Sequence, residues 1–215
     1  VSDNAATGVV SGIRSVSYKV TSLGQQTQTG DLYTYTATAG SLDDLTKSVS
    51  RNFTVDAGLN NSNDVQIEVT AVDNAGNTYK TTNVIKIDIT APTIEVSYDN
   101  NSGDTTFGDD TYFKESRTAT VKVTERNFDP AKVIPVIEAS AGGVPSISGW
   151  TTVGGSGNGD DTVNIATIYY GNDADYTFNI SAEDIAGNKS GEVNYGNSLA
   201  PTKFTVDKTV PVISV

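Results

Sequence analysis

Hydrophobic and polar residues alternate along many short segments of the chain. Side chains on a β-strand point to opposite faces in turn, so this period of two predicts strands with one buried face. No window keeps apolar residues at helical spacing over three turns. The clearest alternating sets are Val65, Ile67, Val69 and Ala71, and Tyr176, Phe178, Ile180 and Ala182. We therefore expect an all-β protein.

These two strands begin a repeat. Each leads into Asp-x-Ala-Gly-Asn, at 73–77 and at 184–188. Asp bonds its own backbone, and Gly and Asn accept positive φ, so the motif predicts a tight turn. A second strand follows, with Ile85, Ile87 and Ile89 in one copy and Phe204 and Val206 in the other. Thr-x-Pro then ends the strand, because proline has no backbone N–H to donate to a neighbouring strand.

The repeat predicts two tandem domains, 1–91 and 92–215, with the last residues opening a further module. Further strands are expected at 16–20, 33–37 and 49–55 in the first domain and at 119–123, 133–137 and 163–169 in the second. Pro135 predicts an edge strand or a bulge. About seven short strands per domain favour β-sandwiches over barrels. Val1 to Asn4 align with Val96 to Asp99, so we expect the chain to be an excerpt from a longer array.

Composition narrows the possible functions. The chain has no cysteine and no histidine, which removes thiol nucleophiles and imidazole acid–base or metal chemistry. A carboxylate pair at a recognisable glycosidase spacing is also missing, so catalysis is not expected. The net charge of −12 disfavours nucleic-acid binding. No run of about 20 apolar residues predicts a membrane span.

The paired turns and Thr-x-Pro junctions resemble the ends of bacterial immunoglobulin-like domains. The stretch 117–130, Arg-Thr-Ala-Thr-Val-Lys-Val-Thr-Glu-Arg-Asn-Phe-Asp-Pro, is similar to modules of very large cell-surface proteins of clostridial-type Gram-positive bacteria. The resemblance implies two tandem immunoglobulin-like β-sandwich domains. It also implies stalk or adhesin regions anchored at the cell wall, and no catalytic residues.

The expected function is accordingly structural, with neighbouring modules of the same chain as partners. Two alternatives stay open. The second domain could recognise a host glycan or protein with its loops near 99–116 and 139–161. The chain could also serve as a spacer within a secreted glycoside hydrolase or protease.

Acidic residues beside the predicted junctions are candidate calcium ligands, because Ca²⁺ prefers hard oxygen ligands. The candidates are Asp73, Asp88, Asp99, Asp184 and Asp207, with Asp3, Asp104, Asp109 and Asp110 near the same ends. No EF-hand-like spacing is present, so we expect Asp73 and Asp184, with Asn77 and Asn188, to cap turns instead. No cofactor is expected beyond this candidate Ca²⁺.

Trp150 and Tyr170 are the candidate binding aromatics. Trp150 is the only tryptophan, and an exposed ring could stack on a sugar or anchor a partner. Buried aromatics dominate the cores of small domains, so the sequence favours core positions for both.

Overall fold

The computed structural model describes residues 1–4, 9–36, 46–99, 105–107, 110–155, 161–193 and 203–214. The chain is all-β, and its sheets are antiparallel apart from one parallel pair. It divides into two compact units, Val1–Ile89 and Thr90–Val215. The division falls two residues before the boundary predicted from the repeat. Within the described residues, no helix has the length and apolar character needed to cross a membrane.

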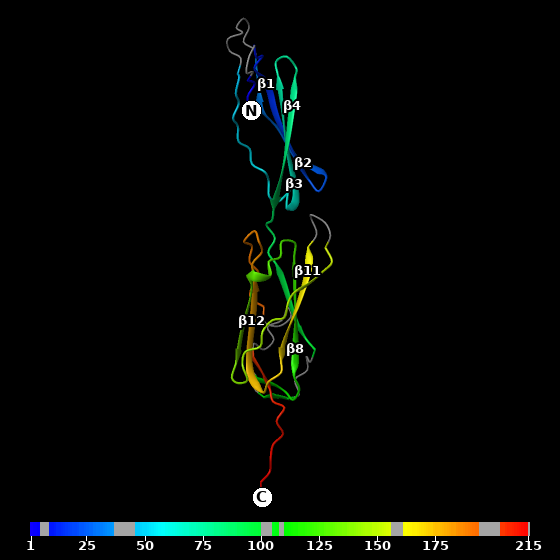
Figure 1. Ribbon diagram of the computed structural model, residues 1–215, viewed down its shortest axis with the longest axis vertical. Helices are drawn as coiled ribbons and strands as arrows, with labels where there is room; N and C mark the ends of the chain where they lie inside the picture. The colour runs from blue at the N-terminus through cyan, green and yellow to red at the C-terminus, as the bar shows by residue number, and fades with distance from the viewer. Residues whose placement is uncertain are drawn as a thin grey trace. The chain divides into compact units, whose positions relative to one another are not determined.

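The first unit contains one sheet, in the order β2-β1-β3-β4. Its strands are β1 (Ile13–Ser22), β2 (Gln25–Thr34), β3 (Ser62–Asp73) and β4 (Thr78–Ile87). Figure 1 shows residues 46–56, in cyan, running beside this sheet, where Ser48 forms an isolated bridge with Ser2 but no named strand is present. The expected strand at 49–55 is therefore wrong as a hydrogen-bonded strand, although Val49 is buried. The described residues of this unit thus form one sheet, which differs from the sandwich expected for this domain.

The second unit is a β-sandwich of two sheets, with orders β10-β11-β8-β5 and β6-β7-β13-β12-β9. Figure 1 shows β12 in one layer and β8 and β11 in the other. The first sheet contains β5 (Thr93–Tyr98), β8 (Arg117–Glu125), β10 (Thr151–Val153) and β11 (Thr162–Tyr170). The second contains β6 (Thr105–Phe107), β7 (Asp110–Phe113), β9 (Val133–Ala139), β12 (Ala174–Ala182) and β13 (Lys203–Val206).

A single apolar core lies between the two sheets. It combines inward residues of β5 and β8, such as Val96 and Val121, with Phe178 and Ile180 of β12. Phe204 of β13 completes an aromatic group, in which its ring lies 5.0 Å from that of Tyr170. The alternating sequence of β12 thus buries every second side chain, as predicted.

The structure also tests the expectations for the strands that contain Pro135 and residues 163–169. Pro135 lies in β9, which is an edge strand of its sheet, as predicted. The expected strand 163–169 forms as β11, but Val163, Ile165 and Tyr169, which alternate along it, are not its fully buried residues. Asn164, Ala166, Ile168 and Tyr170 point inward instead. Both faces of β11 carry apolar residues, so its alternation alone does not decide which face is buried.

The long stretches expected to be loops contain strands. Residues 99–116 include β6 and β7, and residues 139–161 include β10. A short 3-10 turn, η1 (Pro130–Lys132), connects β8 to β9. Asp129 caps it by accepting a hydrogen bond from the Ala131 amide at 3.0 Å. These stretches therefore extend the two sheets of the second unit as well as connecting them.

Candidate functional site

The Asp-x-Ala-Gly-Asn turn is built in the same way in both units. In the second unit the Asp184 carboxylate accepts from the backbone N–H of Asn188 at 2.9 Å and from its side-chain amide at 2.8 Å. In the first unit Asp73 accepts the same two bonds from Asn77, at 2.7 and 2.6 Å. The bonds to Asn77 hold the pKa of Asp73 below its usual value.

The remaining positions of the motif also have structural roles. The amide of each Asp donates to the carbonyl of the Asn, at 3.0 Å in both turns. Gly76 and Gly187 adopt φ of 91° and 95°, in the left-handed region that favours glycine. The prediction that Asp73 and Asp184 cap turns is confirmed.

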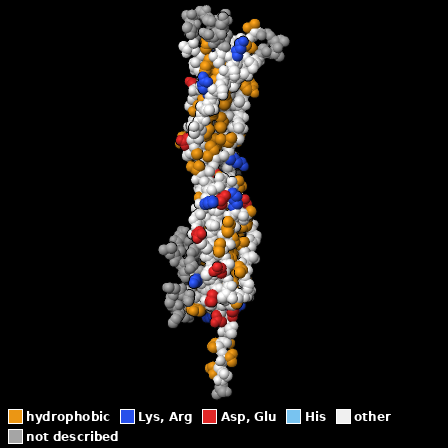
Figure 2. Space-filling view, turned by 90° about the vertical axis from the view of Figure 1, so that its left-hand side faces the viewer, with side chains coloured by type: hydrophobic (Ala, Val, Ile, Leu, Met, Phe, Trp, Pro, Cys, Tyr) orange, Lys and Arg blue, Asp and Glu red, His pale blue; other side chains and the backbone are white. Residues whose placement is uncertain are grey.

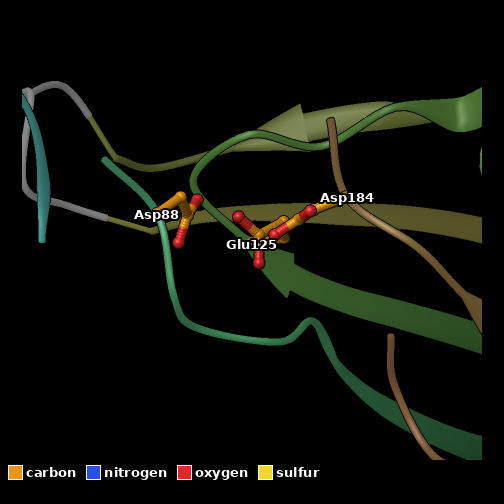
Figure 3. Close-up of side chains that lie close together, drawn as sticks. All are labelled: Asp88, Glu125 and Asp184. Carbon is orange, nitrogen blue, oxygen red and sulfur yellow. The ribbon is translucent and has the colours of Figure 1, made fainter. Parts of the chain in front are cut away.

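Asp184 also lies beside a second buried carboxylate. Glu125 ends β8 and is 2% exposed, whereas Asp184 is fully buried. Their carboxylate oxygens come within 4.8 Å of one another (Figure 3). The Asn127 amide donates to Glu125 Oε1 at 2.7 Å. Asp88, the third side chain labelled in Figure 3, belongs to the first unit.

This pair is the part of the second unit best suited to hold a hard divalent cation. Calcium takes six to eight oxygen ligands, and the pair offers two side chains, one of which already caps a turn. Sequence reasoning missed Glu125. Its position in the sequence could have indicated burial. Glu125 continues the alternating buried positions of β8 after Ala119, Val121 and Val123.

Two other predicted metal candidates of the second unit, Asp99 and Asp207, are not brought to this pair. Asp99 follows β5 at the opposite end of β8, where it accepts from the Thr118 amide at 2.8 Å. Asp207 follows β13, which is antiparallel to β12, so it also lies far along the sandwich from Asp184. Asp104 and Asp109 lie outside the described residues. Within the second unit, Asp184 is therefore not joined by Asp99 or Asp207.

An ion pair ties the Asp184 turn to η1. Lys132 Nζ lies 2.8 Å from Glu183 Oε1 and donates to the Asp184 carbonyl at 3.0 Å. Lys189 approaches the other oxygen of Glu183 at 3.5 Å. The Lys132 ammonium lowers the pKa of Glu183, and Glu183 in turn raises the pKa of Lys132.

The candidate aromatic residues lie in or against the core. Tyr170 is fully buried, and burial raises the pKa of its phenol. Trp150 is partly buried and packs edge-on against Phe128 with ring centroids 5.1 Å apart. Tyr170 therefore occupies the core position that the sequence favours, and Trp150 packs against that core without being fully buried. The exposed aromatic nearby is Tyr169, with 63% of its surface accessible beside the loop 142–145.

A shallow groove of about 510 Å³ crosses the outer face of the five-stranded sheet. Its lining includes Tyr112, Glu138, Asp175 and Lys203. The hydroxyl of Thr177 donates to Glu138, and that of Thr205 donates to Asp175. Both carboxylates are therefore already bonded within the sheet, as expected for the solvated face of a sandwich.

Removing the buried cap should be costly. We expect Asp184→Ala to lower the free energy of unfolding of the second unit by about 2 kcal/mol, because a buried amide and a side-chain amide lose their acceptor. Urea unfolding followed by Trp150 fluorescence measures it. Asp73→Ala, in the more exposed first turn, serves as the matched variant and should cost its own unit less, as measured by hydrogen exchange of β3, since Trp150 lies in the second unit. An Asp184→Ala variant as stable as the wild type would contradict this account.

Acid should weaken the Lys132–Glu183 pair. Because the folded-state pKa of Glu183 is depressed, its contribution is complete above its unfolded pKa, near 4.5, and disappears as the pH falls through the folded value. Glu183→Gln and Lys132→Met should each flatten the fall in stability of the second unit below about pH 4.5. The double variant should flatten it no further. Additive effects in urea titrations at several pH values would show that the residues titrate independently.

Comparison with known proteins gives no match: no family model, curated protein or solved structure is similar to this chain.

Proposed function

We propose that the chain contributes two non-catalytic, immunoglobulin-like stalk modules to an exported bacterial cell-surface protein. Support comes first from the second unit, whose sheet order matches that of a seven-strand immunoglobulin sandwich. In that scheme β5, β8, β11 and β10 take the places of strands A, B, E and D, and β9, β12 and β13 those of C, F and G. The resemblance of residues 117–130 to modules of large surface proteins supports the cellular location.

The observation that carries a mechanical role is the pairing of β13 with β7. The two strands are parallel, with Thr205 opposite Tyr112 and Val206 opposite Phe113. The Asp207 amide extends the pairing by donating to the Phe113 carbonyl at 2.9 Å. The pairing joins the last strand of the unit to a strand near its beginning.

This geometry resists a pull along the chain. A stalk module is loaded through its two ends, so tension enters ahead of β7 and leaves after β13. In a parallel pair these two points lie at opposite ends of the ladder. The hydrogen bonds lie across the pull, and they must break together rather than one after another.

Single-molecule force spectroscopy on the full chain tests the proposal. We expect the second unit to unfold in one event, at a lower force in Asp207→Pro, which lacks the donating amide. Asp207→Ala keeps the amide and is the matched control, expected to unfold near the wild-type force. Equal forces for the proline and alanine variants would overturn the proposed mechanical role.

A further inference from the structure

Strand β9 forms one edge of the five-stranded sheet in the second unit. It pairs with β12 on one side, and within the described residues no strand pairs with its other side. An unpaired edge exposes backbone N–H and C=O groups that a strand of another chain could bind. The sequence of β9, Val-Ile-Pro-Val-Ile-Glu-Ala, is mostly β-branched and carries one charge, so it fits such pairing well.

Two aliphatic side chains lie on the solvent face of this edge strand. Ile134 and Val136 alternate with the inward residues of β9 and are 59% and 56% exposed. Their partners on β12 are the polar residues Ser181 and Asn179, so no apolar side chain lies directly opposite them. Hydrophobic side chains are visible at the surface of the second unit in Figure 2. An added strand would therefore gain apolar contacts as well as backbone hydrogen bonds.

The direction in which Pro135 presents its backbone follows from its partner on β12. Pro135 is opposite Ile180. The Ile180 amide donates to the Val193 carbonyl at 3.0 Å, and the Ile180 carbonyl accepts from the Val193 amide at 2.9 Å. Both backbone groups of Ile180 are thus used on the side away from β9, so Ile180 and Pro135 form a non-hydrogen-bonded pair. The nitrogen and the carbonyl of Pro135 therefore face the open edge.

A proline at this position changes only the open side of the strand. Its nitrogen has no hydrogen to donate, and its ring occupies the space that a partner carbonyl would approach. The ladder between β9 and β12 keeps its hydrogen bonds, because these come from the neighbouring pairs Ile134–Ser181 and Val136–Asn179. Pro135 thus removes a donor where a further strand would need one, and nowhere else.

We propose that Pro135 blocks self-association of the protein through β9, and that β9 of a second copy is the strand it excludes. Two identical edges related by a two-fold axis pair antiparallel. When the axis passes beside residue 135, Ile134 of each copy lies opposite Val136 of the other, so the exposed aliphatic side chains match. In that register the two prolines also face each other, and neither can donate the central hydrogen bond.

Restoring the amide tests the proposal. Pro135→Val supplies the missing N–H, so the two-fold contact regains two hydrogen bonds. We expect its association constant, measured by sedimentation of the full chain, to exceed that of the wild type by roughly tenfold or more. Pro145→Val makes the same change in the loop after β9 and is the matched control, expected to behave as the wild type. Equal association of Pro135→Val and the wild type would overturn the proposal.

Hydrogen exchange locates the contact. The amide of Ile137 also faces the open edge, two residues along from Pro135, and lies opposite the Val133 carbonyl of the other copy in this register. Its exchange should slow as the concentration of Pro135→Val rises, and the amide of Val136, which points to β12, should not change. Association that leaves Ile137 unprotected would overturn the proposal. Pro135→Thr restores the same amide and should give the same result, so the test does not depend on the folding of one variant.

Discussion

Replacing Arg117 with alanine should lower the free energy of unfolding of the second unit by about 3 kcal/mol, one of the two largest effects we expect. Arg117 begins β8 and is 5% exposed. Its guanidinium carbon lies 3.7 Å from the ring centroid of Phe113, 3.9 Å from that of Tyr98 and 4.6 Å from that of Phe204. These rings come from three strands in both sheets, so the side chain joins the two layers at this end of the core.

Alanine would remove the cation from three ring faces and leave a cavity between them. A desolvated cation–π contact is worth about 2 kcal/mol, and the lost packing adds to it. The free energy of unfolding of Arg117→Lys should lie between those of the wild type and Arg117→Ala. An ammonium keeps the charge of arginine but cannot stack on the rings as the planar guanidinium does. Trp150, the only tryptophan, reports on this unit in urea unfolding.

Lys203→Ala is the matched control, since Lys203 is an exposed cation on β13 of the same unit. It should change the free energy of unfolding by no more than about 0.5 kcal/mol. If Arg117→Ala lowered the free energy of unfolding as little as Lys203→Ala, the aromatic contacts would contribute little to the stability of the core.

The positions of Arg117 and Glu125 show where sequence reasoning was limited. Alternation located β8 and its apolar residues Ala119, Val121 and Val123. The alternation did not indicate that the same buried face of β8 also includes a charged residue at each end of the strand. A charge is costly to bury unless it finds partners, and those partners come from other strands that local sequence does not specify.

Tertiary partners also explain the outcome for the first unit. The strands that alternation predicted around Val65 and Val16 form, because each finds a neighbour in the sheet. The segment 49–55 has the same alternation, yet among the described residues its backbone pairing stops at Val49, which bonds to Val1. Strand propensity describes fit to a half-buried pleated surface, and a ladder needs a second strand. The turn at Asp184 was predictable because the hydrogen bonds that close it join Asp184 and Asn188, within five residues.

The second large effect compares two isoleucines in corresponding strands. Ile180 of β12 is 1% exposed, whereas Ile67 of β3 is only partly buried. We expect Ile180→Ala to cost the second unit about 4 kcal/mol, because it removes three carbons from a sealed core and leaves a cavity. Ile67→Ala should cost the first unit about 1 kcal/mol, since water already reaches that side chain.

Segment-resolved hydrogen exchange measures both costs in the same full-length chain, from the opening free energies of β12 and β3. Equal costs would mean that the apolar face of the first unit is as well sealed as the core of the second.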